Sequence, residues 1–176
     1  MNKTLRVSSL ILGTALATSA SLSVRADDMH EADQLAKAKV SLGQAVQLAE
    51  KPDQSKTLNA EFDIEKGHPL WEVKTLGAAG VREYKVDANT GAILKVEDEH
   101  IRGRLTNFIT GMNMKDLDAA KTTLPQAIMM AEKSMNGKAV KVEVEHEHNG
   151  IQYDISVRSA DATRKVKVDG ATGKVM

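Results

Sequence analysis

Cysteine is absent from this sequence of 176 residues. Its absence excludes disulfide bonds, thiolate metal sites, a cysteine nucleophile and a lipid anchor attached to cysteine. Aromatic residues are few, with one tryptophan, two tyrosines and two phenylalanines, so the stacking platforms of proteins that bind single-stranded nucleic acid are missing. The fold must therefore be stabilised by the packing of aliphatic side chains.

The chain also lacks an excess of positive charge and a long hydrophobic segment. Lysine and arginine together number 24, as do aspartate and glutamate, and this balance argues against a nucleic-acid partner. The apolar run 7–20 is shorter than the ~20 residues that a membrane span needs. It follows a basic start and precedes the small residues Val24 and Ala26. Residues 1–26 are therefore predicted to be a signal peptide, and the protein to be periplasmic or secreted with no membrane span after cleavage.

What the sequence does contain is a repeat with a constant spacing of 82 residues. Such a period indicates a small domain rather than a solenoid unit, whose period is usually about 20–50 residues. We predict repeats at 40–98 and 122–176, a charged helical leader at 27–39 and a helical connecting segment at 99–121. The recurring residues are Leu42, Gln44, Ala45, Ala49, Glu50, Lys51, Lys85, Val86, Asp87, Thr90 and Gly91, which return as Leu124, Gln126, Ala127, Ala131, Glu132, Lys133, Lys167, Val168, Asp169, Thr172 and Gly173.

Each repeat is predicted to begin with a capped helix. Ser41 and Gln44 have the spacing of a capping box, and Thr123 and Gln126 reproduce it in the second repeat. In this motif both side chains bind free backbone groups of the first turn. Apolar residues then recur at i, i+3, i+4 and i+7, which is typical of one buried helix face. Pro52 is expected to end the first helix.

Strands are predicted after each helix. Valines alternate with charged residues before Asn149-Gly150, a hairpin dipeptide, and the alternation resumes after it. The aligned turn of the first repeat is Gly67-His68, which suits a type II′ turn. We therefore predict an α+β fold of two tandem repeats, each with one helix packed on a three- to four-stranded antiparallel sheet. The later strands are expected at 81–86 and 92–96 in the first repeat and at 163–168 in the second, where only 174–176 remain for a fourth strand.

These elements together resemble a known family. The helix reads Leu-x-Gln-Ala-x-x-x-Ala-Glu, a strand reads Trp-Glu-Val or Tyr-Asp-Ile, and the closing segment reads Tyr-Lys-Val-Asp-Ala-Asn-Thr-Gly. This pattern resembles the PepSY domain, present here in tandem and covering nearly all of the chain after residue 26. The second copy departs from it where Ala171 replaces Asn89. The family takes its name from the propeptides of thermolysin-like peptidases, and the resemblance implies an exported module that contacts proteins and inhibits or regulates a protease.

The segment from Asp87 to Gly91 is similar to a calcium-binding loop, but we predict a structural turn. A calcium loop of the EF-hand type needs ligands at positions 1, 3 and 5 and glycine at position 6, whereas glycine here arrives one position early. In a turn, Asp87 and Asn89 bond nearby backbone donors and Gly91 takes a positive φ. Asp169 and Gly173 are expected to do the same in the second repeat.

The cluster Glu145-His146-Glu147-His148 is the one motif with the chemistry of a metal site. On a strand, His146 and His148 would project from the same face about 7 Å apart. Two imidazoles suit zinc, copper or nickel, and a third ligand such as His68 or His100 would have to come from elsewhere. The alternative is that the two histidines simply end the buried face of the strand next to an exposed turn.

Catalysis is not predicted, because no nucleophile motif surrounds a serine and no His-Glu-x-x-His helix is present. Apart from the metal hypothesis, no cofactor is expected. The favoured function is an exported, non-enzymatic module that binds another exported protein or peptide, with a peptidase among the candidates, and exposed sheet edges are the expected contact surfaces. Trp71 and Tyr153 occupy aligned positions and are predicted either to anchor each core or to contact the partner. The alternative function is periplasmic metal binding through His146 and His148.

Overall fold

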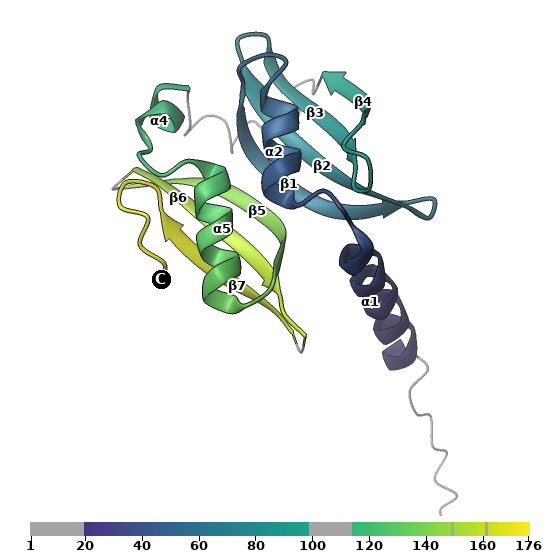
Figure 1. Ribbon diagram of the computed structural model, residues 1–176. Coiled ribbons are helices and arrows are strands. Elements are labelled where there is room, and N and C mark those ends of the chain that lie inside the picture. Colours follow the sequence, from purple (N-terminus) through teal and green to yellow (C-terminus); the bar gives the residue numbers. More distant parts are fainter. Residues whose placement is uncertain (1–19, 99–113, 149, 161) are drawn as a thin grey trace, which may run out of the picture.

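The computed structural model describes residues 20–98, 114–148, 150–160 and 162–176, with side chains from Met29 onward. Figure 1 shows helices lying over one face of a twisted sheet, with α1 extending away from it. The described helices are α1 (Ala20–Lys37), α2 (Leu42–Glu50), α4 (Met114–Ala119) and α5 (Leu124–Met135). The described strands are β1 (Lys56–Glu65), β2 (His68–Gly77), β3 (Gly80–Asp87), β4 (Ile93–Asp98), β5 (Lys138–Glu147), β6 (Gly150–Arg158) and β7 (Thr163–Asp169).

All of the described strands belong to one antiparallel sheet with the order β4-β3-β2-β1-β5-β6-β7. The predicted α+β class is confirmed, but the prediction of a separate sheet in each repeat is wrong. β1 of the first repeat pairs with β5 of the second, and the ladder is centred on Ala60 and Val142. A strand at a sheet edge leaves a row of backbone groups unpaired. Pairing β1 with β5 removes two such edges, which is the physical reason for the fusion.

The junction between the repeats has local two-fold symmetry. Ala60 and Val142 are equivalent residues, 82 positions apart, and they face each other directly. On either side, Asn59 faces Glu143 and Glu61 faces Lys141. A surface that pairs with its own equivalent in this way has the geometry of a symmetric dimer interface. The duplicated sequence has therefore folded as an internal dimer.

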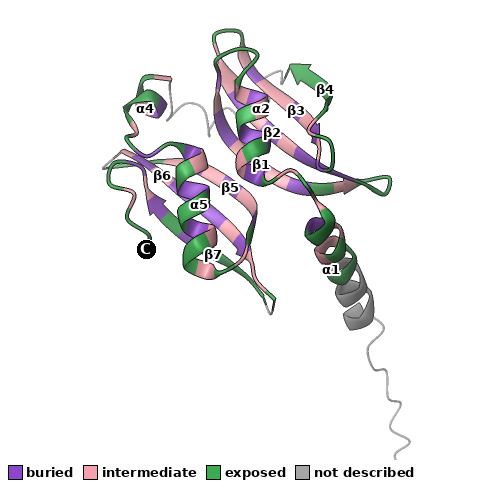
Figure 2. Ribbon diagram, viewed as in Figure 1, coloured by how far each residue is buried: buried purple, intermediate pink, exposed green. Residues whose placement is uncertain are grey.

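One hydrophobic core lies between the helices and the sheet, and it runs through both repeats. The purple segments of Figure 2 follow the sides of α2 and α5 that face the strands. The opposite face of the sheet carries charged side chains that pair across strands, as in Lys85 with Glu72 at 3.0 Å and Lys165 with Glu143 at 3.3 Å. The buried residues of the two helices are Leu42, Ala45, Val46 and Ala49 in α2 and the equivalent Leu124, Ala127, Ile128 and Ala131 in α5.

The helix starts follow the predicted capping chemistry. In α2 the Ser41 N–H donates to Gln44 Oε1 at 2.9 Å, and the Gln44 N–H donates to Ser41 Oγ at 3.3 Å. In α5 the Thr123 N–H donates to Gln126 Oε1 at 3.0 Å. These bonds satisfy backbone donors that the first turn of a helix otherwise leaves free.

The first hairpin turn differs from the prediction of a type II′ turn at Gly67-His68. His68 pairs with Glu65 and is already part of β2, so the turn residues are Lys66 and Gly67. Both have positive φ, at 51° and 82°, which is the pattern of a type I′ turn. This turn matches the twist of the flanking strands, so the register of the strands decides which two residues occupy it.

A further helix precedes the main helix of each repeat: α1 precedes α2, and the shorter α4 precedes α5. Leu35 near the end of α1 and Leu117 in α4 are equivalent residues, and both are buried. Residues 1–19 of the predicted signal peptide and residues 99–113 of the predicted connecting segment lie outside the described residues, whereas residues 20–26 form the start of α1. Among the described helices, none combines the length and apolarity needed to cross a membrane.

Candidate binding groove between the helices

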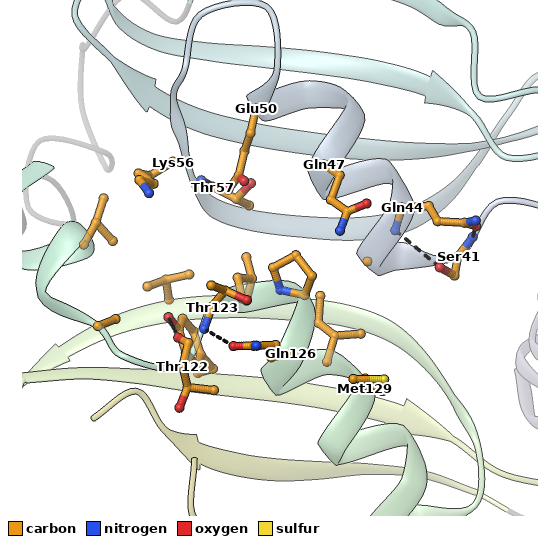
Figure 3. Close-up of a pocket in the computed structure, with 18 of the residues that line it drawn as sticks. Ser41, Gln44, Gln47, Glu50, Lys56, Thr57, Thr122, Thr123, Gln126 and Met129 are labelled. Carbon is orange, nitrogen blue, oxygen red and sulfur yellow. Dashed lines mark hydrogen bonds between the residues drawn. The ribbon is translucent and has the colours of Figure 1, made fainter. Parts of the chain in front are cut away.

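A groove of about 710 Å³ lies between α2 and α5. Figure 3 shows it as a channel with α2 on one side and the start of α5 on the other. α2 and α5 line the groove with equivalent faces. Every lining residue from α2 and its N-cap has an equivalent, 82 positions later, that also lines the groove. The groove is thus a product of the internal symmetry. The five pairs are Ser41 and Thr123, Gly43 and Pro125, Gln44 and Gln126, Gln47 and Met129, and Glu50 and Glu132.

Gly43 lies where the two helices approach each other, and a β-carbon there would make ordinary van der Waals contacts. A β-carbon at this position would already lie 3.9 Å from Ile128 Cγ2 and 4.0 Å from the Pro125 Cα. A larger side chain would therefore extend into the space between the helices, because little room remains there.

Two equivalent glutamates connect the helices to the sheet. Glu50 Oε1 accepts the Thr57 N–H at 2.8 Å, and Glu132 Oε1 accepts the Ala139 N–H at 2.9 Å. Both acceptors serve strands at the point where a β-bulge interrupts the ladder, and a bulge leaves backbone groups unpaired. A carboxylate has several acceptor sites, so Glu50 and Glu132 can bind these donors and still accept from a ligand.

The floor of the groove includes a buried hydroxyl. Thr57 is 2% exposed and its Oγ1 has no hydrogen-bond partner within the described part of the chain. The equivalent residue of the second repeat is Ala139, which has no polar side-chain atom. Leaving a hydroxyl buried without a partner costs about 1–3 kcal/mol. Thr57 is therefore a buried polar residue in the lining of the groove whose hydroxyl is left without a partner.

Trp71 and Tyr153, the aligned aromatic residues, belong to the core. They are 1% and 4% exposed, and each holds the segment that leads into its own helix. Trp71 Nε1 donates to the Val40 carbonyl at 2.9 Å, and the Tyr153 hydroxyl donates to the Thr122 carbonyl at 2.8 Å. Burial, followed by the nearby Glu50 carboxylate, raises the pKa of Tyr153 to about 12. Tyr153 also lines the floor of the groove.

The charged side chains of the groove are mostly negative. Among the described residues of its lining, three are acidic and one is basic: Glu50, Glu132 and Asp118 against Lys56. Lys56 Nζ lies 3.1 Å from Asp118 Oδ1, so its charge is largely matched. The two glutamates give the groove a net negative character, which attracts basic groups.

The two histidines of the candidate metal site lie in different local structures. β5 ends at Glu147, which pairs with Gly150. His146 is therefore on the strand, while His148 occupies the turn, and both are exposed. Within the described ranges no group of three or more histidine, aspartate or glutamate side chains could hold a metal ion. His100 lies outside those ranges, and metal binding stays an untested hypothesis.

The aspartate turns recur with the same bonds in both repeats. Asp87 Oδ1 accepts the Asn89 N–H at 2.9 Å and the Thr90 N–H at 2.8 Å. Asp169 Oδ1 accepts the Ala171 N–H at 3.1 Å and the Thr172 N–H at 2.7 Å. The glycines that follow, Gly91 and Gly173, have φ of 74° and 73°. Besides the aspartate and the glycine, both turns share a threonine. The Thr90 hydroxyl donates to Asp87 at 3.0 Å, and the Thr172 hydroxyl donates to Asp169 at 2.7 Å.

These turns predict a loss of stability in acid. The Thr90 and Asn89 N–H donors lower the pKa of Asp87 below 3.8, and the Thr172 hydroxyl and N–H lower the pKa of Asp169 in the same way. A carboxyl with a lowered pKa in the folded state contributes stability above its unfolded pKa and loses it as the pH falls through the folded pKa. Urea denaturation from about pH 5 down to pH 2 should show this fall.

The double substitution Asp87→Asn/Asp169→Asn should flatten that pH dependence, since asparagine keeps an acceptor oxygen but does not titrate. The control Asp63→Asn changes an exposed residue of β1 and should leave the slope as it is. An equally steep acid dependence in the double variant would contradict the assignment.

Some of the residues that line the groove are identical in the two repeats, and this identity is the sequence signal that could have identified them. Glu50 and Gln44 are identical to their equivalents in the second repeat, but the sequence indicated only a cap for the glutamine and no role for the glutamate. Gln47 and Met129 differ between the repeats and carry no sequence signal. Their place in the groove follows from the packing of α2 beside α5.

Comparison with known proteins agrees with the duplication. The family model PepSY, described as "Peptidase propeptide and YPEB domain", matches residues 39–97 and 123–176. No curated protein sequence matches significantly. One solved structure, at 1.85 Å, of a protein from Clostridium difficile 630 that is provisionally described as a lipoprotein, aligns with 17% identity and a TM-score of 0.47. The alignment covers 79% of this chain and 91% of that chain.

Proposed function

Because this chain belongs to the PepSY family, with a match to each of its repeats, we propose that it is an exported, non-enzymatic module that binds a segment of another exported protein. The family description names peptidase propeptides, which supports a protein partner and makes a peptidase the first class to examine. The groove between α2 and α5 is the proposed binding site. The observation that carries this proposal is the groove lining, which comes from equivalent residues of both repeats.

An extended, basic segment fits the chemistry of this groove best. Carboxamides can donate to and accept from a peptide backbone, and Gln44, Gln47 and Gln126 line the groove. Glu50 and Glu132 would attract lysine or arginine side chains. Met129 is 60% exposed, and a flexible thioether adapts to varied apolar side chains. The sequence-based expectation placed the contact at sheet edges, whereas the groove offers a concave site with both polar and apolar groups.

Photocrosslinking tests this function directly. A photoreactive phenylalanine derivative at Gln47 or Met129 should form adducts with a protein in an extract of exported proteins, because both side chains border the groove. Oligolysine should suppress the adducts by competing for the negative lining, and oligoglutamate should not. Mass spectrometry of the adducts would then show whether the partner is a peptidase.

The same probe at Ser134 is the matched control, because Ser134 is exposed on α5 but outside the groove. No adduct from Gln47 or Met129, or the same adducts from Ser134, would count against the groove as the site. The alternative function, metal binding at His146 and His148, would need a further ligand, and no contact among the described residues supports it.

A further inference from the structure

Strand β4 forms one edge of the sheet and is exposed along its whole length. Among the described strands it pairs only with β3, and each of its six residues is exposed. Three of these are large and apolar: Ile93 at 40%, Leu94 at 55% and Val96 at 47%. An exposed apolar edge strand invites pairing with another strand. Proteins that remain monomeric usually protect such an edge.

The register of β4 places its side chains on defined faces. Val96 faces Tyr84 of β3, and Tyr84 is buried in the core beneath α2. Val96 therefore lies on the helix-covered face. Lys95 and Glu97 flank it and lie on the opposite, open face, where their side chains are 2.8 Å apart.

Asp98 of β4 pairs with Arg82 of β3 at 2.9 Å, but the other two charged residues of β4 match poorly with their β3 partners. Lys95 faces Lys85 and Glu97 faces Glu83, and like charges directly opposite each other in a ladder are unfavourable. Lys85 instead pairs with Glu65 and Glu72 on its other side. A strand that paired with the free side of β4 would match its charges if it placed an acidic residue opposite Lys95 and a basic residue opposite Glu97.

Such a strand is β4 itself, read in the antiparallel direction. If Val96 faces Val96 of a second copy, Lys95 of each chain faces Glu97 of the other. The junction between β1 and β5 already has this design: Ala60 and Val142 lie at a local two-fold axis on the helix face, beside Glu61 and Lys141, which pair at 3.1 Å on the open face. The chain thus contains, at the junction of β1 and β5, one pairing with the geometry of the proposed contact.

We propose that the protein forms a homodimer through antiparallel pairing of β4 with β4 of a second copy, with the two-fold axis at Val96. The dimer continues the sheet across two chains. Its contact is independent of the groove between α2 and α5, so the two proposals can fail separately.

Charge reversal across this contact tests the proposal. The purified protein should sediment as a dimer, and Lys95→Glu or Glu97→Lys alone should raise the dissociation constant about tenfold or more, since each change puts two like-charged pairs across the axis. Mixing the two variants should restore a dimer, because every Lys95–Glu97 contact then joins opposite charges. Each reversal also improves the match with β3, so loss of folding is not expected.

Lys133→Glu, at an exposed position of α5, is the control for a change in net charge and should leave the dimer intact. Because the chain lacks cysteine, Val96→Cys should form a disulfide-linked dimer under mild oxidation, and Ile93→Cys should not, since only residue 96 faces its own copy. A monomer at all concentrations would overturn the proposal. So would a dimer that is unaffected by both charge reversals, or a mixture that does not recombine.

Discussion

Replacing Trp71 by alanine is expected to lower the free energy of unfolding by about 3–5 kcal/mol, the usual cost of deleting a large buried aromatic side chain. Trp71 is 1% exposed and packs edge-on against Phe62, with ring centroids 5.1 Å apart. The substitution also leaves the Val40 carbonyl without its indole donor. A typical domain is stable by 5–15 kcal/mol, so a large part of the total is at stake.

Urea denaturation followed by far-UV circular dichroism measures this loss. Trp71→Phe keeps an aromatic ring but removes the N–H donor together with one ring of the indole; a loss of about 1–3 kcal/mol is expected. Tyr153→Phe removes the equivalent donor of the second repeat and should cost about as much. A loss below about 1 kcal/mol for Trp71→Ala would show that the core does not depend on this anchor.

Replacing Ala60 by glutamate is expected to destabilise the junction between the repeats by about 4 kcal/mol or more. Ala60 is 0% exposed and faces Val142 under the helices. A glutamate there would have to bury a charge without a partner or force β1 away from β5, and both are costly. Ala78→Glu, at an exposed position in the turn after β2, is the matched control and should change stability by less than about 0.5 kcal/mol.

The same experiment tests whether the repeats fold as one unit. Tryptophan fluorescence reports on the first repeat, since Trp71 is the single tryptophan, and circular dichroism reports on both. Because the sheet and core are continuous, the two signals should change together in one transition for the parent protein. Two separate transitions, one seen by fluorescence and a later one seen only by circular dichroism, would contradict a shared core.

Local elements were largely predictable because neighbouring residues decide them. The capping residues Ser41 and Thr123 start α2 and α5 as predicted. The bonds of Asp87 and the positive φ of Gly91 follow the turn chemistry of these residue types. The predicted turn at Gly67-His68 was misplaced by one residue, because the register of β1 with β2 decides which residues turn. The same register places His148 in a turn rather than on a strand.

The groove was predictable only in part. Glu50 and Glu132 are among the residues that recur in the two repeats, but their identity did not indicate a groove. Alternation and helical periodicity indicate only which side chains face the core. Gln47 and Met129 lie on the solvent side of their own helices and acquire a role only because the second helix lies alongside. A surface shared by two elements depends on their relative position, which no local pattern contains.

The sequence by itself determined the duplication, the α+β elements of each repeat and the aspartate turns at Asp87 and Asp169, because these rest on contacts between residues close in the chain. Only the tertiary structure decided that the repeats share one sheet. A strand with one buried face shows the same alternation of residues whether it lies at an edge or in the centre of a sheet. The pairing of Ala60 with Val142, and with it the groove above the junction, therefore comes from the need to satisfy free strand edges and cover one continuous core.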